Sequence, residues 1–325
     1  MAEALLRRGQ PVRVLCRAGS VARAPVGAEV VEGDITDAAS VERAARGAGS
    51  IIHAAARVSR GGTRADFLRV NVDGLLHGLH AAAAARVERV LYTSSFFALG
   101  PSDAAGEAPC DETALFRACA DLDHYQASKR AAALVAQHAA RAGAPIVTLY
   151  PGVLIGPGRW TEGNFVTALV RDHLRGKLVP MPGGGVRPWS YVHVDDVVAG
   201  HLSALDHAPA GSSFVLGGEN ASLRGLFEGV RELTGVAPPR LSAPFPLMWL
   251  AGFGEEIGES VFGRSPRVLT RGVARVLDRA WALDSSRAAR ELAHAPRPLI
   301  DILRDTIAWL ERQGEVAPGT LKAAP

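Results

Sequence analysis

A tyrosine and a lysine stand four residues apart in the segment HYQASK, residues 124–129. If this segment is helical, Tyr125 and Lys129 lie one turn apart on the same face, so the ammonium can approach the phenol. A nearby cation favours the phenolate and lowers the pKa of a tyrosine from about 10 toward neutrality. Such a phenol can move a proton to or from the oxygen of an alcohol. We therefore predict that Tyr125 is an acid/base and that Lys129 is its cationic partner.

The composition makes this pair informative. The chain has four tyrosines and three lysines against 33 arginines, so a Tyr–Lys pair at helical spacing rarely arises by chance. A lysine is also a compact charge that can lie beneath a ribose and a phenol together, which a planar guanidinium does poorly. The alternative is a surface pair without a role, and we favour the functional interpretation.

A pair of serines follows the apolar segment LYT, residues 91–93. The carboxyl ends of parallel strands form the edge where α/β sheets bind ligands, and a hydroxyl at that edge can hold a carbonyl oxygen. Two serines end many strands that have no such role. Because Tyr125 and Lys129 follow about 30 residues later, we predict that Ser95 positions the reacting oxygen.

Strand-like and helix-like segments alternate through the first half of the chain. The strands are apolar throughout, which indicates a parallel sheet covered by helices on both faces. The predicted strands are residues 12–15, 29–31, 50–54, 89–93 and 145–149, the predicted helices are 38–45, 66–85 and 123–142, and an insertion covers 100–121.

Glycines and prolines break the chain into loops beyond Pro151, and shorter elements follow. The predicted elements are strands at 191–194 and 214–216, a helix opened by Asp195, and helices near 222–234, 268–279 and 298–313. We predict a nucleotide-binding domain from residues 1–152 and 190–217, and a smaller, mostly helical substrate-binding region from residues 153–189 and 218–325. The tail, residues 314–325, is predicted to be disordered.

Composition excludes several classes of protein. In the 325 residues no apolar run reaches the roughly 20 residues of a membrane span, and the longest, 245–253, contains Pro246. Cys16, Cys110 and Cys119 form neither a CxxC pattern nor a zinc-site spacing, which predicts a cytoplasmic protein without disulfides or bound metal. The net charge of +3 comes from scattered arginines rather than a basic tract, so we predict no nucleic-acid partner.

Further motifs, taken with these residues, resemble the extended short-chain dehydrogenase/reductase family, which includes the NAD-dependent epimerases and dehydratases. Within it, the dihydroflavonol-reductase-like and farnesol-dehydrogenase-like branch is the most similar. Besides Ser95, Tyr125 and Lys129, the motifs are GDI at 33–35, HAAA at 53–56, Asn71, YPG at 150–152, GPG at 156–158, YVHVDD at 191–196 and LGGEN at 216–220.

The resemblance implies a Rossmann-type doubly wound sheet that binds NAD(P), and a possible homodimer. It implies that Tyr125 is the acid/base, that Lys129 also holds the nicotinamide ribose, and that Ser95 steadies the substrate oxygen. The other implied cofactor contacts are Asp34 and Ile35 at the adenine, Ala54, Ala55 and Ala56 along the middle, Pro151, Gly152 and Val153 at the nicotinamide, and Asn71 as a support. Arg17 lies where the family distinguishes cofactors, and its charge favours NADP over NAD.

The first residues are similar to the back half of an amphipathic helix that ends at Gly9. Members of the family begin with a strand, a GxxGxxG turn and the front of that helix, and the turn binds the pyrophosphate. We expect that this strand and turn are lacking here and that they lie upstream of Met1.

The residues after the active-site hydroxyl bear on the reaction. Phe96 and Phe97 stand where dehydratases of the family carry Asp-Glu, so we predict a dehydrogenase or reductase that acts on a largely apolar small molecule, with residues 246–250 as a lid. A nucleotide-sugar epimerase is the alternative, with Arg187 at a diphosphate. A non-catalytic nucleotide-binding relative is a third possibility, because the phosphate-binding turn is missing.

Overall fold

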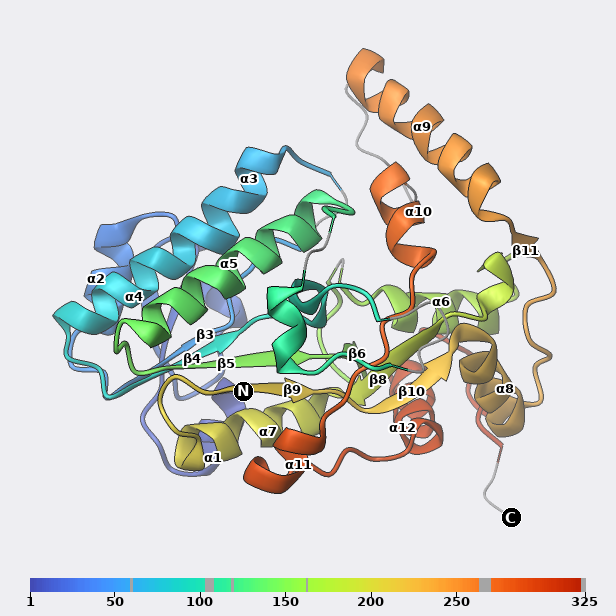
Figure 1. Ribbon diagram of the computed structural model, residues 1–325. Coiled ribbons are helices and arrows are strands. Elements are labelled where there is room, and N and C mark those ends of the chain that lie inside the picture. Colours follow the sequence, from blue (N-terminus) through green and yellow to red (C-terminus); the bar gives the residue numbers. More distant parts are fainter. Residues whose placement is uncertain (59–60, 103–107, 118–119, 162, 263–269, 323–325) are drawn as a thin grey trace.

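Parallel strands form the centre of the structure, a computed structural model that describes residues 1–58, 61–102, 108–117, 120–161, 163–262 and 270–322 (Figure 1). One sheet has the order β3 (Ser50–His53), β4 (Arg89–Thr93), β5 (Ile146–Pro151) and β9 (Ser213–Leu216), with every pair parallel. A second parallel pair consists of β1 (Arg13–Cys16) and β2 (Glu29–Glu32). The α/β fold class predicted from the alternating pattern is confirmed.

Helices cover both faces of the parallel strands (Figure 1). One layer contains α2 (Ala38–Ala45), α3 (Arg64–Leu68), α4 (Gly74–Ala84) and α5 (His124–Arg141), and the other contains α1 (Ala2–Arg7), α7 (Val194–His207) and α11 (Ser286–Leu292). Leu75 of α4 and Ala132 of α5 pack on Tyr92 of β4, whereas Ala288 of α11 packs with β9 around Phe214. The burial of both sheet faces explains why the strands are apolar throughout.

The long helix predicted over residues 66–85 is interrupted by one π-helical turn. Thr63 and Asp66 form a capping box at the start of α3, and the π turn Arg69–Asp73 then leads directly into α4. A π turn inserts an extra residue into the helix and is frequent at functional sites. It lies where the helix passes the carboxyl edge of the sheet, and it contains the buried Asn71.

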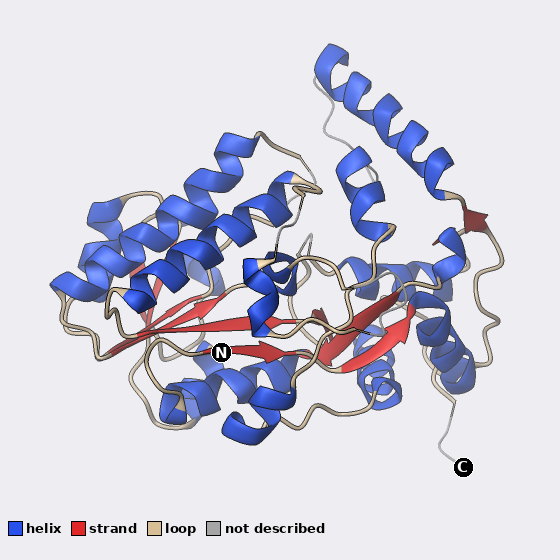
Figure 2. Ribbon diagram, in the orientation of Figure 1, coloured by secondary structure: helices blue, strands red, loops and turns tan. Residues whose placement is uncertain are grey.

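The second region is built on a mixed sheet of β6 (Val153–Ile155), β8 (Pro188–His193) and β10 (Glu219–Ser222), drawn in red in Figure 2. Its core lies between this sheet and the helices α6 (Phe165–Leu174), α8 (Leu223–Thr234) and α12 (Leu299–Arg312). The short strands β7 (Met181–Pro182) and β11 (Ser242–Ala243) pair nearby. The helix α9 (Phe245–Phe262) extends away from the rest of the molecule and packs against α10 (Arg271–Leu277) (Figure 1).

Three details differ from the sequence predictions. Asp195 does not cap α7, because the ring Nδ1 of His193 accepts the hydrogen bond from the backbone N–H of Asp195 at 3.1 Å. The tail is not disordered through Lys322: Val316 is buried, and the N–H of Lys322 donates to the carbonyl of Leu233. The helix α11 belongs to the region predicted to bind substrate, yet it covers the parallel sheet.

Some predictions fall outside the described residues. They concern Cys119, parts of the insertion at 103–107 and 118–119, the start of the helix predicted at 268–279, and the last three residues of the tail. Within the described part of the chain, no helix is both long and apolar enough to cross a membrane.

The parallel strands are interrupted between β1 and β3. Among the described residues, no strand pairs with the edge of β1 that faces away from β2 or with the edge of β3 that faces away from β4. Leu15 of β1 and Ile51 of β3 nevertheless pack against one cluster around Val41, and Val12 and Ile52 pack against another around Leu5. The same two helix layers therefore continue across the interruption.

Candidate active site

Several predicted site residues directly follow strands of the four-stranded sheet. Ala54 follows β3, Ser95 lies two residues beyond β4, and Gly152 follows β5. Because these strands are parallel, their carboxyl ends meet at one edge, as at the ligand-binding edge of other α/β sheets. Arg17 occupies the same position after β1 in the separate pair.

The structure brings Ser95 and Tyr125 together at this edge. Asp123 caps α5 by accepting a hydrogen bond from Gln126 N–H at 2.6 Å, so the helix begins with Tyr125 in its first turn. The Ser95 hydroxyl is buried and accepts a hydrogen bond from the N–H of Phe97 at 3.3 Å, and it lies near enough to the phenol of the half-buried Tyr125 to lower its pKa in part. Two hydroxyls side by side at a strand end can donate to one carbonyl oxygen.

Lys129 lies one turn further along α5, and its side chain is buried. Its Nζ donates to the backbone carbonyl of Thr93 at 3.1 Å and stands 5.4 Å from the ring centroid of Tyr92. Burial lowers the pKa of Lys129 from 10.5 to about 8, because the ammonium has little water around it.

The pKa of Tyr125 moves in the direction opposite to the one predicted. Burial raises it to about 12; the nearby hydroxyl of Ser95 lowers it in part, and the negative charge of Asp123 raises it further. The predicted fall toward neutrality is therefore wrong for the protein without its cofactor. The cost of desolvating the phenolate outweighs its attraction to the ammonium of Lys129, because that ammonium is directed to the Thr93 carbonyl. A neutral Tyr125 is suited to donate a proton.

Asn71 connects the loop after β3 to the helix that carries Tyr125. Its Oδ1 accepts from the N–H of Arg57 at 2.7 Å, and its Nδ2 donates to the hydroxyl of Ser128 at 2.8 Å. That hydroxyl in turn donates to the backbone carbonyl of Tyr125 at 2.8 Å. Since Asn71 is buried, losing it leaves several polar groups without partners, which fits the predicted supporting role.

The predicted cofactor residues near the first strands are open to solvent. Ala54 and Ala55 are exposed and Ala56 is half-buried, so their small side chains leave the backbone accessible. Asp34 accepts two hydrogen bonds from Thr36, and these hold the pKa of its carboxyl below the usual value. The exposed Arg17 also lowers it, and Ile35 packs against the adjacent helix layer.

Gly152 marks a close approach of two backbones beside the site. A Cβ atom at this position would lie 2.8 Å from the carbonyl oxygen of Ser190, so only glycine fits between β5 and β8. Pro151 is buried and Val153 is half-buried beside it. These residues and Lys129 suit a ribose and a flat ring. The pyrophosphate of a dinucleotide needs the backbone N–H groups of a glycine-rich turn, which this group of residues does not supply.

Aromatic rings form one side of the site. The ring of Phe97 lies 5.8 Å from that of Tyr125 and 4.7 Å from that of Trp281, both in edge-to-face geometry. Phe96 is buried behind it against Trp281 and Trp189. The two tryptophans were not predicted: they come from β8 and from the segment after α10, and neither stands in a recognisable motif.

The structure does not place Arg187 or the predicted lid at the hydroxyl pair. The guanidinium of Arg187 lies 3.5 Å from the carboxylate of Asp278 in a small hollow behind Trp189. Leu247 and Leu250 of α9 are 61% and 59% exposed, so this segment does not cover the site.

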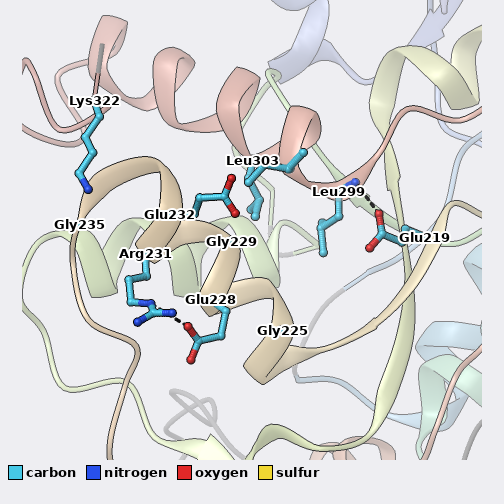
Figure 3. A pocket seen from close by; sticks show the side chains of 11 residues that line it. Glu219, Gly225, Glu228, Gly229, Arg231, Glu232, Gly235, Leu299, Leu303 and Lys322 are labelled. Atoms are coloured by element: carbon cyan, nitrogen blue, oxygen red, sulfur yellow. Dashed lines mark hydrogen bonds and ion pairs between the residues drawn. The ribbon is translucent and has the colours of Figure 1, made fainter. Parts of the chain in front are cut away.

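A larger open hollow of about 640 Å³ lies between α8 and α12 (Figure 3). Glu228 on its rim pairs with Arg231 at 2.8 Å, and Glu219 accepts from the N–H of Leu299 at 2.9 Å. None of the predicted site residues lines it. We therefore place the chemistry at the strand ends.

The burial of Lys129 predicts a dependence of stability on pH. Its pKa is lower in the folded state, so the unfolded chain binds more protons between pH 8 and 10.5, and stability rises with pH across that window. Replacing Lys129 by Met removes this rise, which is on the order of 3 kcal/mol in full. Urea unfolding of both forms from pH 7 to 10 measures the difference.

Lys177→Met is the matched control, because the Lys177 side chain is 57% exposed. It should keep the pH dependence of the unmodified chain. If the free energy of unfolding changes with pH equally in the unmodified chain and in Lys129→Met, the ammonium of Lys129 is not desolvated.

Comparison with known proteins identifies the family. The model of the NAD dependent epimerase/dehydratase family matches residues 1–217. Sterol demethylase protein B of Methylococcus capsulatus is 29% identical over 97% of this chain and 95% of its own length. A putative dihydroflavonol 4-reductase of Synechocystis is 30% identical over 96% and 91%. The Thermus thermophilus UDP-glucose 4-epimerase complex with NAD is 24% identical, with a TM-score of 0.71 over 94% and 93%. The chain therefore belongs to the NAD-dependent epimerase/dehydratase family, the extended short-chain dehydrogenases/reductases, and has their Rossmann-type fold.

Proposed function

We propose that the protein is an NAD(P)-dependent oxidoreductase that interconverts an alcohol and a ketone or aldehyde on a largely apolar small molecule. The observation that carries the proposal is that the buried Ser95 hydroxyl lies close enough to the Tyr125 phenol to lower its pKa in part, with Lys129 buried one helical turn away. This arrangement holds a proton donor, a second hydroxyl and a cation at the ligand-binding edge of a parallel sheet.

In the reducing direction, the substrate oxygen accepts hydrogen bonds from Ser95 and Tyr125. A bound NAD(P)H would supply the hydride that the carbonyl carbon receives. The negative charge that develops on the oxygen is met by the proton of Tyr125, which is present because the pKa of this phenol is about 12. Lys129 stabilises the tyrosinate that remains and would hold the ribose hydroxyls of the cofactor, while Pro151, Gly152 and Val153 would lie beside its nicotinamide.

Phe97 supports an apolar substrate. It is half-buried and its ring edge meets Tyr125, so it lies where substrate carbons would surround the reacting oxygen. No carboxylate occupies that position to expel water, which argues against a dehydratase. The names of two relatives, a sterol demethylase protein and a dihydroflavonol reductase, agree with redox chemistry on apolar molecules.

A nucleotide-sugar epimerase is the second candidate, because the fold is similar to that of a UDP-glucose epimerase. In that reaction Arg187 would meet the diphosphate. The guanidinium is instead paired with Asp278 behind Trp189, which favours the oxidoreductase.

We propose NADP as the preferred form of the cofactor, because the exposed Arg17 after β1 can pair with a 2′-phosphate. We also propose that the region of residues 1–152 and 190–217 binds the cofactor and that the remainder binds substrate. A homodimer through α4 and α5 would cover Leu134, which is 42% exposed on the outer face of α5.

We further propose that one more strand, followed by a glycine turn, fits between β1 and β3 and completes the pyrophosphate site. The proposal rests on the two unpaired edges and on the helix layers that continue across them. Fusing an apolar strand and a GxxGxxG turn ahead of Met1 should raise the unfolding temperature and create micromolar NAD(P) binding by calorimetry.

A control fusion keeps the strand but replaces the three turn glycines with valine. It should retain most of the added stability and lose the binding, because the N–H groups then cannot approach the phosphates. If the glycine-containing fusion alters neither property, the interruption is not a strand site.

Changing Tyr125 to Phe removes the proton donor and should lower kcat by roughly 10²- to 10⁴-fold at an unchanged unfolding temperature. Ser95→Ala should cost on the order of 10²-fold. The assay measures NAD(P)H with straight-chain and farnesol-like alcohols, and sugar interconversion with UDP-sugars, on whichever form of the chain binds cofactor.

Tyr150→Phe, which removes a phenol hydroxyl from the core, is the matched control and should stay within a few-fold of the unmodified enzyme. Full activity of Tyr125→Phe would refute the mechanism. Sugar interconversion without net redox would select the epimerase, and the absence of both reactions would select a non-catalytic nucleotide-binding protein.

Replacing Arg17 by Ser should weaken NADP binding about tenfold and leave NAD binding within twofold, because only the 2′-phosphate is lost as a partner. Titration calorimetry with both cofactors measures this ratio. Arg23→Ala, at the other end of the same short helical turn (Ala18–Arg23), serves as the control and should change neither affinity. Equal losses for NAD and NADP in Arg17→Ser would exclude a 2′-phosphate contact.

A further inference from the structure

Trp189 is shared by the aromatic side of the active site and by a hollow behind it. Its ring lies 6.3 Å from the ring of Phe97, which itself meets the ring of Tyr125 at 5.8 Å. The same tryptophan also lines a hollow formed by Phe165, Val166, Leu223 and Leu277 together with Arg187, whose guanidinium pairs with Asp278. Trp189 therefore separates the aromatic side of the active site from the hollow, and we call it the partition.

The backbone of Trp189 is held on two sides, so the partition has a fixed place. On β8 it pairs with Ala221 of β10, and it forms a parallel bridge to Trp281. The neighbouring residues are fixed as well, since the N–H of Trp281 donates to the carbonyl of Pro188 at 2.7 Å and the N–H of Ser190 donates to the carbonyl of Trp281 at 3.1 Å. A smaller side chain at this position should enlarge the space without moving the strand.

The hollow behind the partition is apolar but nearly filled. Its free volume is about 30 Å³, which is the space of one water molecule. An apolar chain cannot continue into it while the indole is in place. The guanidinium of Arg187, which lines the hollow and pairs with Asp278, adds a cost for any carbon chain that would displace it.

We propose that Trp189 sets the length of the apolar arm that the site accepts: the arm runs from the oxygen held at Tyr125 along Phe97 and ends against the indole. The inference rests on the proposed function in that the arm belongs to the molecule whose oxygen meets Tyr125. Trp189 is then a residue that determines substrate specificity. The hollow behind it could hold the end of a longer arm once the indole is removed.

Binding of a homologous series of straight-chain primary alcohols, from butanol to decanol, tests this by calorimetry without cofactor or turnover. In the unmodified protein the affinity should rise about fourfold per methylene and then level off where the chain meets the indole. In Trp189→Ala the plateau should move to chains that are longer by several methylenes. Decanol should then bind at least tenfold more tightly than it does to the unmodified protein.

Trp160→Ala is the matched control, because Trp160 packs against Trp309 and does not line the hollow. It should keep the original plateau. Adding Val166→Phe to Trp189→Ala refills the space and should restore the shorter limit. If Trp189→Ala does not fold, Trp189→Phe keeps an aromatic ring beside Phe97 and should shift the plateau by fewer methylenes.

An unchanged plateau in a folded Trp189 variant would overturn the inference, as would an equal shift in Trp160→Ala. Failure of the proposed function has a different signature, namely full turnover by Tyr125→Phe. The alcohol series measures binding alone, so the two outcomes are separable.

Discussion

The limited access of water to two ionisable side chains at the end of β4, Lys129 and Tyr125, is the constraint on which the rest of the site depends. Lys129 is buried and Tyr125 is half-buried on one face of α5, and their partial loss of water lowers the pKa of the lysine to about 8 and raises that of the tyrosine to about 12. Both groups are thereby shifted toward their neutral forms. The ionised form of either side chain becomes favourable only when a polar partner replaces the excluded water. In the proposed reaction, a ribose and a developing alkoxide are such partners. In the proposed reaction, Tyr125 therefore keeps its proton until a substrate oxygen arrives.

The surrounding structure holds this arrangement by many weak restraints. Asp123 fixes the start of α5, Thr93 receives the ammonium of Lys129, and Asn71 ties α5 to the loop after β3. The π turn explains how Asn71 is presented, because an extra residue in the helix turns this amide toward Ser128. The aromatic rings then give the open side of the site a rigid, apolar wall, whose outer part is Trp189. Polar groups and aromatic groups therefore have separate tasks: the first hold protons and charge, and the second determine shape.

The secondary structure and the fold class could be predicted because they depend on local periodicity. The strand at 89–93 and the helix at 38–45 have the predicted bounds, and Ser95 lies two residues beyond that strand, at the carboxyl edge of the parallel sheet. Local patterns did not reveal the π turn or the capping of α7 by His193. Both depend on which backbone hydrogen bonds the tertiary contacts leave available. The tail was predicted to be disordered from its composition, but the contact of Lys322 with α8 holds it in place.

The sequence by itself determined the identity and chain order of the candidate reactive groups, because hydroxyl, phenol and ammonium chemistry depends on residue type and helical spacing. Only the tertiary structure decided their protonation and surroundings. The pKa of Tyr125 follows from how much water the folded chain excludes, which no spacing rule encodes. Likewise, Trp189 and Trp281 reach the site from positions far along the chain, through the bridge between their two backbones. Spacing is a property of neighbours in sequence, whereas desolvation and ring packing are properties of neighbours in space.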